Sequence, residues 1–376
     1  MKICMVISTP FPPEEGIGYH VYNIARRLIR RGHTVTVLTR GTFVEEHDTY
    51  DGIEVVRVPF VPIYPFHVAL HKHYLQNYIR KHECEFDILH IHSPLAPYIE
   101  TNLPTVSTIH TSVVEDAKHI ENVDAKSLMT KCLTKYVSYP CISSLLEQSD
   151  VVTTVSESVI GELKQHYNYN NAVITGNGVD EVTFRPKEVT DDQTIGDQEF
   201  ILYVGRLSYR KGLFDLLESA KAVSGISDAK FIIIGKGELE FKLKKIICNK
   251  TYSGRVQLLG HVNRTDLISY YQNSAVFVMP SHYESGPLTL LEAMSCGRPV
   301  ISTSVGIAPE LITTNENGIV VPPGSVEDIT KSIAFLLENK SFREKLGRNA
   351  RNTIENNSTW DSITCRVEAC YQRATE

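Results

Sequence analysis

Two short stretches in the second half of the chain hold the residues best suited to chemistry. In "LYVGRLSYRKG", Arg206 directly follows an apolar run, and Lys211 comes five residues later, near a predicted helix start. Two fixed cations close to a helix N-terminus suit a diphosphate, because the helix end attracts anions and the cations neutralise charge on a leaving group. A solvated basic turn is the alternative, and these residues alone leave both interpretations open.

The second stretch, "MPSHYESGPLTLLEAMSCGRPVIS", pairs two glutamates around a predicted helix start. Pro287 suits the first helical position, which puts Glu284 just before the helix and Glu292 within it. Two such carboxylates could accept hydrogen bonds from the hydroxyls of a polyol, and the helix start could offer amides to phosphate. A capping acid plus a surface acid is the alternative. Against it, Glu292 lies in the apolar run "PLTLLEAM", where an acid usually needs a partner.

His110 and a glycine turn are the remaining candidates. His110 ends the strand-like run "PTVSTIHT", and ligands bind at the carboxyl ends of parallel strands, so a site role and simple packing are both open. In "PPEEGIGYH", Gly16 and Gly18 follow the first strand, but Val21 replaces the third glycine of a dinucleotide fingerprint. The turn is therefore best explained as a tight strand–helix connection.

Other catalytic motifs are missing from the sequence. It contains no P-loop, no H-E-x-x-H, no Cys/His zinc spacing, no G-x-S-x-G and no D-x-D. The net charge of -6, without a long basic block, excludes nucleic acid as an expected partner. Eight cysteines without a C-x-x-C pair indicate reduced thiols and a cytoplasmic location. No apolar run is long enough to span a membrane. Two predicted helices, 66–82 and 125–148, carry aromatic and basic residues; surface packing is favoured there, and peripheral contact with the inner face of a membrane stays open.

The elements that must position these residues alternate between strand and helix, which predicts an α/β fold with doubly wound parallel sheets. A Gly-, Pro- and acid-rich segment from Gly176 to Gln198 separates two such series. We therefore predict one domain over 1–184, a second over 185–358 and a final helix over 359–376. The predicted strands are Ile3–Ile7, Thr34–Leu38, Ile53–Val58, Ile88–Ile91, Thr105–Ile109, Val151–Thr154, Val173–Thr175, Phe200–Val204, Phe231–Ile234, Val256–Leu259, Val276–Met279, Val300–Ser302 and Ile319–Val321.

Taken in order, the motifs resemble the retaining GT-B glycosyltransferases of glycosyltransferase family 4. The resemblance implies two facing Rossmann-like domains with a deep cleft between them, the first on the acceptor side and the second on the donor side. It also implies that the final helix packs back onto the first domain. The motifs that carry it are the glycine turn before "HVYNIARRL", then "RGHTVTVLT", "DILHIHSP", "STIHT", "VVTTVSES", "GNGVDEVTFRP", "VGRLSYRKG", "LLGHV" and "PSHYESGPLTLLEAMSCGRPVI".

The resemblance also implies residue roles and a reaction. Arg206 and Lys211 would hold the donor diphosphate as it leaves, Glu292 the ribose and Glu284 the donor sugar. The remaining donor contacts would come from Gly286, Leu288, Val262, His110 and Gly16. The substrate would be a UDP- or GDP-sugar, used without a cofactor or metal, and the acceptor a sugar, glycan or lipid-linked hydroxyl. A sugar-nucleotide epimerase, a sugar phosphorylase and a non-catalytic partner subunit are the alternatives.

Three positions depart from the family pattern. Glu15 replaces the first glycine of the turn, Gly286 stands where a bulky residue is common, and Pro287 has no amide to donate. We expect Gly16 and Gly18 to let the backbone approach the donor sugar or the acceptor. Glu15 would then discourage an anionic group on that acceptor.

Glu15→Gly is expected to raise the use of phosphorylated acceptors relative to neutral ones, because it removes a negative charge near the acceptor. The ratio of initial rates with a matched neutral and phosphorylated acceptor measures this. An unchanged ratio would rule out the role given to Glu15.

Overall fold

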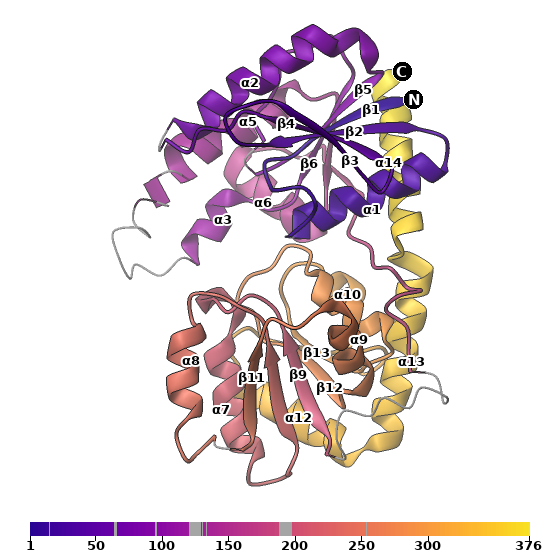
Figure 1. The fold of residues 1–376 in the computed structure, drawn as a ribbon. Coiled ribbons are helices and arrows are strands. Elements are labelled where there is room, and N and C mark those ends of the chain that lie inside the picture. The colour runs from indigo at the N-terminus through magenta and orange to yellow at the C-terminus, as the bar shows by residue number, and fades with distance from the viewer. Residues whose placement is uncertain are drawn as a thin grey trace. The chain divides into compact units, whose positions relative to one another are not determined.

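The chain divides into two compact units in the computed structural model (Figure 1): Met1–Gly178 with Trp360–Glu376, and Val179–Thr359. The sequence placed this division at 184, whereas the structure assigns residues 179–184 to the second unit. They pack there because the amide of Val179 donates to the carbonyl of Ser358 at 2.9 Å and Phe184 lies in the second core. The structure describes residues 1–14, 16–63, 66–94, 96–119, 129, 131–132, 134–187, 198–252 and 254–376.

The first unit is built on an eight-stranded sheet in the order β3-β4-β2-β1-β5-β6-β7-β8. Every neighbouring pair is parallel except β3 and β4. The strands are β1 (Lys2–Val6), β2 (Thr34–Arg40), β3 (Glu46–Tyr50), β4 (Ile53–Val58), β5 (Ile88–His92), β6 (Thr105–Ile109), β7 (Val151–Thr154) and β8 (Val173–Ile174). Most strands here are buried on both faces, as a sheet covered by helices on each side requires.

Helices cover both faces of this sheet (Figure 1). They are α1 (Gly16–Arg30), α2 (His67–His82), α3 (Val113–Lys118), α5 (Tyr139–Gln148), α6 (Glu157–Tyr167) and α14 (Trp360–Thr375), with a 3-10 turn at Glu83–Glu85 and a π-helical turn at Thr134–Ser138. The final helix α14 lies along α1, where Arg27 Nε meets Asp361 Oδ2 at 3.3 Å and Arg31 pairs with Glu368.

The second unit holds a six-stranded, fully parallel sheet in the order β11-β10-β9-β12-β13-β14. Two apolar clusters fill its two faces under helices. The strands are β9 (Phe200–Val204), β10 (Lys230–Ile234), β11 (Val256–Gly260), β12 (Val276–Met279), β13 (Val300–Thr303) and β14 (Ile319–Val321). The helices are α7 (Leu213–Val223), α8 (Glu240–Ile247), α9 (Arg264–Asn273), α10 (Leu288–Ser295), α11 (Ala308–Leu311), α12 (Val326–Glu338) and α13 (Lys340–Asn357), with a 3-10 turn at Tyr209–Lys211.

These elements confirm the predicted α/β class and each of the predicted strands to within about two residues. The strand that the sequence did not reveal is β3, whose sequence "EHDTY" is polar and exposed at the sheet edge. Such a strand has no apolar pattern to detect, and charged side chains suit an unpaired edge. The predicted helix over 66–82 is α2. Residues 125–128, 130 and 133 of the 125–148 prediction lie outside the described residues, and its remainder contains the π-helical turn and α5.

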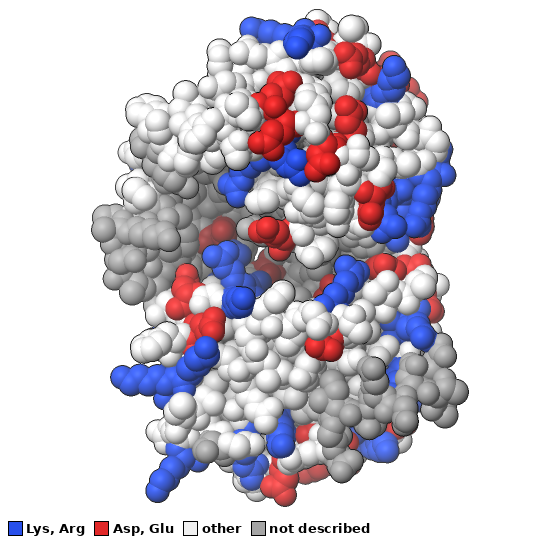
Figure 2. All heavy atoms as spheres, in the orientation of Figure 1, with Lys and Arg blue, Asp and Glu red and all other residues white. Residues whose placement is uncertain are grey.

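Figure 2 shows lysine and arginine side chains intermixed with aspartate and glutamate on the visible face. No helix among the described residues has the length and apolarity needed to cross a bilayer.

Gly212 allows the loop after β9 to approach the loop after β12 closely. Its φ is +64°, and a Cβ there would lie 1.9 Å from the carbonyl oxygen of Pro280. Only glycine therefore permits this approach. The approach brings the 3-10 turn that ends at Lys211 beside the segment that follows β12.

Gly212→Ala is expected to lower the free energy of unfolding of the second unit by at least about 3 kcal/mol, since it adds both backbone strain and a backbone clash. Urea unfolding followed by fluorescence measures the change. Gly225→Ala is the matched control, because its Cβ would meet nothing nearer than 3.8 Å. Equal stability of the two variants would contradict this account of the loop.

Candidate active site

Several of the predicted donor residues lie at the carboxyl edge of the second sheet. Arg206 follows β9, Val262 follows β11, and Glu284 and Gly286 follow β12. Because all six strands are parallel, their carboxyl ends share one edge, and the loops that leave it meet one another. Two further close approaches tighten this edge: a Cβ on Gly235 would lie 1.8 Å from the carbonyl oxygen of Gly205, and one on Gly237 would lie 2.3 Å from that of Leu207.

Lys211 and Glu284 form an ion pair at this edge, 2.5 Å between Nζ and Oε1. Their side chains are only 15% and 10% exposed. Ser281 Oγ also donates to Glu284 Oε1 at 2.9 Å. A lysine and a glutamate so enclosed must be paired, since an isolated buried charge is costly. Sequence reasoning assigned the two residues to different parts of a ligand and did not reveal that they contact each other.

Arg206 differs from Lys211 in its surroundings. Its side chain is exposed, and no described residue pairs with its guanidinium. Its backbone is fixed, because the buried Tyr203 hydroxyl donates to the Arg206 carbonyl at 3.1 Å. Arg206 is thus a free cation at this edge, whereas Lys211 is already neutralised by a carboxylate. Tyr203 was not among the predicted residues, since it looks like an ordinary apolar strand position.

Glu292 lies in α10 and is partly buried. The Tyr271 hydroxyl from α9 donates to its Oε2 at 2.8 Å. Desolvation raises the pKa of Glu292 to about 7, although the Tyr271 hydrogen bond and the charge of Arg264 both act to lower it. The carboxyl therefore changes its charge near neutral pH. Tyr271 and Arg264 were missed because the residues that anchor a side chain leave no motif in the sequence.

The start of α10 corrects one prediction. The helix begins at Leu288, and Pro287 lies one residue outside it with an extended ψ of 117°. Proline removes one amide at this position, so the free amides of the helix start belong to Leu288 and its successors. Gly306 supports the loop before the helix, because a Cβ there would lie 2.7 Å from the Ser285 carbonyl oxygen.

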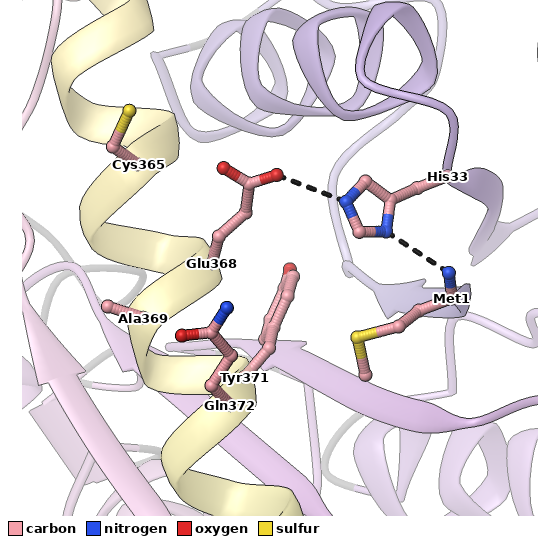
Figure 3. Close-up of a pocket in the computed structure, with 7 residues that line it drawn as sticks. All are labelled: Met1, His33, Cys365, Glu368, Ala369, Tyr371 and Gln372. Carbon is pink, nitrogen blue, oxygen red and sulfur yellow. Dashed lines mark hydrogen bonds and ion pairs between the residues drawn. The ribbon is translucent and has the colours of Figure 1, made fainter.

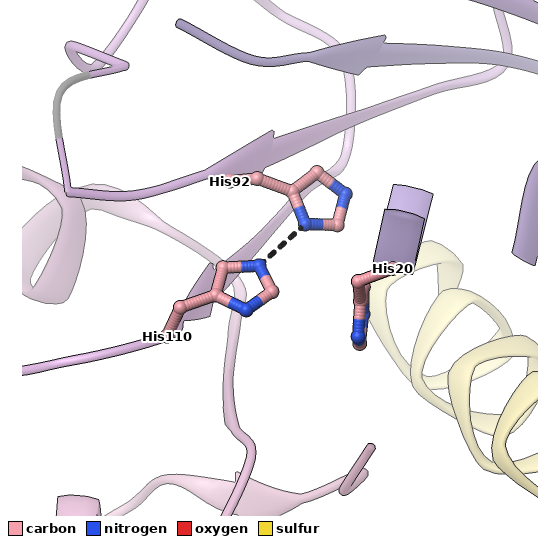
Figure 4. Close-up of side chains that lie close together, drawn as sticks. All are labelled: His20, His92 and His110. Carbon is pink, nitrogen blue, oxygen red and sulfur yellow. Dashed lines mark hydrogen bonds between the residues drawn. The ribbon is translucent and has the colours of Figure 1, made fainter. Parts of the chain in front are cut away.

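In the first unit, three buried histidines lie together at the carboxyl edge (Figure 4). His110 follows β6, His92 ends β5 and His20 comes from α1. His92 Nδ1 is 3.1 Å from His110 Nε2, and the His20 ring meets the His110 ring edge-on at 4.7 Å between centroids. Burial lowers the pKa of all three, that of His20 to about 4, so each ring is neutral at pH 7. His110 was predicted, whereas His20 and His92 were not.

The glycine turn before α1 is only partly described. Gly16 begins α1, is exposed, and would have nothing within 4 Å of an added Cβ. Gly18 is buried, and its added Cβ would lie 3.1 Å from that of Pro13. The tight turn therefore requires glycine at position 18 and leaves position 16 open to a ligand or solvent. Glu15 lies outside the described residues.

One pocket of the first unit is lined by none of these residues. It measures about 260 Å³ and is lined by Met1, His33, Tyr371 and neighbouring residues of α14 (Figure 3). His33 bridges Met1 and Glu368, with 3.0 Å between His33 Nε2 and Glu368 Oε1. None of the predicted site residues lines it, so its position does not mark the site.

The stability of the chain is expected to fall as pH rises from about 4.5 to 7, through Glu292. In the unfolded chain this carboxyl ionises near pH 4.5, whereas in the folded chain it keeps its proton until about pH 7. Between these pH values ionisation stabilises the unfolded state alone, so the free energy of unfolding falls. This contribution is at most about 3 kcal/mol. Glu292→Gln should remove it, which urea unfolding at pH 4.5 and 7.5 would show. The exposed Glu338→Gln is the control, and a wild-type pH slope in Glu292→Gln would contradict the assignment.

Comparison with known proteins identifies the family. Residues 185–353 match the model of the group 1 glycosyl transferases, and residues 15–182 match that of glycosyltransferase family 4. An uncharacterized glycosyltransferase of Methanocaldococcus jannaschii is 28% identical over all of this chain and 99% of its own. Glycogen synthase of Mycobacterium tuberculosis is 25% identical over all of this chain and 95% of its own.

Solved structures share the fold. Sucrose-phosphate synthase from Thermosynechococcus elongatus superposes with a TM-score of 0.83 at 20% identity, covering 99% of this chain and 98% of its own. Anabaena HepE, solved in complex with UDP and glucose, gives 0.77 at 17% identity and covers 99% of each chain. The two matched models together span most of the chain, and the parallel-sheet units agree with them. The chain is a glycosyltransferase of family 4, in the group 1 glycosyl transferases, with the GT-B fold.

Proposed function

We propose that the chain transfers a sugar from a UDP- or GDP-sugar to an acceptor hydroxyl, with retention of anomeric configuration and without a metal. The observation that supports this most is the Lys211–Glu284 pair beside the exposed Arg206, at the carboxyl edge of the second sheet. Cations of this kind stabilise the charge that develops on a departing diphosphate. The first step of the reaction needs little more from the protein than that stabilisation and a fixed geometry.

Arg206 and Lys211 would act differently on the diphosphate. Arg206 has no described partner to give up, so it can bind a phosphate at once. Lys211 is held by Glu284, and that carboxylate would turn its other oxygen, Oε2, to hydroxyls of the donor sugar. The pair would thereby keep the lysine in place before the donor arrives, so that less order has to be created on binding.

The remaining donor contacts would come from the same edge of the second sheet and from two residues of the first unit. Glu292 would accept hydrogen bonds from the ribose hydroxyls while Tyr271 holds its other side. The backbone at Gly286 and Leu288 would reach sugar or phosphate oxygens, and Val262 would lie beside the base. His110 of the first unit would contact the donor sugar as a neutral imidazole, with Gly16 of the same unit approaching the sugar or the acceptor.

The donor class is supported by Anabaena HepE, whose structure is in complex with UDP and glucose. For the acceptor we propose a sugar, a glycan or a lipid-linked hydroxyl at the cytoplasmic side of a membrane. Exposed apolar side chains of the first unit support peripheral contact. Phe43 and Phe66 are 76% and 62% exposed.

Lys211→Met is expected to lower kcat/KM about 10²- to 10³-fold, because it removes a cation that stabilises the leaving diphosphate. Release of nucleoside diphosphate from a panel of UDP- and GDP-sugars measures this. A wild-type chain that neither binds nor cleaves any of these donors would overturn the proposal. Lys221→Ala, an exposed lysine on α7, should leave the rate unchanged.

A double variant separates activity from folding. Lys211→Met alone leaves the enclosed Glu284 carboxylate without its cation, so it should also lower stability. Lys211→Met combined with Glu284→Gln should recover much of that stability and remain inactive. Recovery of turnover together with stability would show that Lys211 serves the fold and not the diphosphate.

A further inference from the structure

We propose that His20, His92 and His110 form a binding site for a transition-metal cation of the Zn²⁺ class. One ring nitrogen from each lies within 4.8 Å of the nitrogens of the other two. The three side chains come from α1, the end of β5 and the residue after β6, and their rings converge on one space (Figure 4). Imidazole nitrogen is a ligand that zinc, copper and nickel prefer, whereas magnesium and calcium prefer oxygen.

The protonation of His20 suits a ligand. Its Nδ1 lies 2.7 Å from Asn177 Oδ1, and an amide oxygen only accepts, so Nδ1 carries the proton. The neutral ring then has a lone pair on Nε2, which is buried and has no hydrogen-bond partner among the described residues. A metal-bound histidine usually donates its other N–H to such an oxygen, which fixes the tautomer and the orientation of the ring.

His92 has an unpartnered nitrogen too. Its Nδ1 shares one proton with His110 Nε2 at 3.1 Å, while its Nε2 is buried without a partner among the described residues. Two buried nitrogens without partners in one cluster are unusual, because buried polar atoms are nearly always satisfied. A single cation would satisfy both.

The distances require a modest adjustment. Zinc binds histidine nitrogen at about 2.0–2.1 Å, so ligand nitrogens around it are roughly 3.4 Å apart. The three nitrogens must therefore approach by no more than about 1.5 Å. His92 Nδ1 would keep the shared proton, and His110 Nε2 would give up its hydrogen bond with His92 so that its lone pair can bind the cation. A fourth position would stay open to water, as in sites with three protein ligands.

His90 shows why these three and not their neighbour form the site. Its ring lies 4.0 Å from that of His92 between centroids, at a tilt of 36°. Its Nδ1 bonds the Tyr371 hydroxyl and its Nε2 bonds Thr108 Oγ1, each at 2.7 Å. Both of its nitrogens are already used. His90 is therefore the matched control, a buried histidine of the same strand that offers no ligand atom.

If the proposed function is right, a metal ion bound at this site would also affect donor turnover. His110 is the residue that we assign to the donor sugar, and a nitrogen bound to a cation cannot also bond a sugar hydroxyl. Zinc would therefore inhibit donor turnover reversibly. This separates the site from a catalytic metal, whose removal would abolish turnover.

Binding is tested on the full chain after treatment with EDTA. One equivalent of Zn²⁺ is expected to bind, Mg²⁺ is not, and zinc-edge anomalous diffraction should place the ion between the three rings. His20→Asn keeps a donor for Asn177 but removes Nε2, and should weaken zinc binding at least about 100-fold, whereas His90→Gln should not. An anomalous peak only at other residues, or His20→Asn binding like the wild type, would overturn the site. If a variant fails to fold, the wild-type anomalous map decides alone.

Inhibition is tested separately with the donor that the wild type turns over. Zinc should lower the wild-type rate, EDTA should restore it, and the rate of His20→Asn should not respond to zinc. Equal inhibition of both proteins would refute the consequence for His110. A wild type that binds zinc at this site but turns over no donor would refute the proposed function and leave the metal site standing.

Discussion

The ion pair between Lys211 and Glu284 constrains the loops at the carboxyl edge of the second sheet. Two charges this far from water are tolerated only when they are held together and hydrogen-bonded. Holding them requires the 3-10 turn after β9 and the loop after β12 to touch, and Gly212 permits that contact by approaching the Pro280 carbonyl. Ser281 and Gly306 then fix the loop that carries the glutamate. An enclosed cation beside a free one is the physical basis of the proposed diphosphate site.

The two units solve the problem of buried titratable groups in opposite ways. In the second unit, charge is retained and paired, and Glu292 is tuned to ionise near neutrality. In the first, burial removes charge from His20, His92 and His110, which pack as neutral rings against one another. His20 also packs against Trp360. Neutral imidazole nitrogens suit zinc, copper and nickel, so a cluster of rings that stay unprotonated near pH 7 is suited to a transition metal.

The parallel sheets bring the charged residues of the second unit together at one edge, and the histidines of the first unit at another. Strand ends along one edge deliver their following residues to one region, whatever their separation in the chain. This is why Arg206 and Glu284, far apart in sequence, share an edge, and why His92 and His110 do as well. Helix α14 completes the first unit from the far end of the chain, with Trp360 against His20.

The sequence by itself determined the α/β class, nearly every strand, the family and the cations and carboxylates proposed for the site, because apolar periodicity and catalytic motifs are local signals. It did not reveal β3, which is polar and exposed, nor the residue at which α10 begins. Only the tertiary structure showed that Lys211 pairs with Glu284, that Tyr271 anchors Glu292 and that His20 and His92 lie beside His110. Such partners come from separate elements and are chosen by packing and by the cost of burying polar groups, neither of which leaves a spacing in the chain.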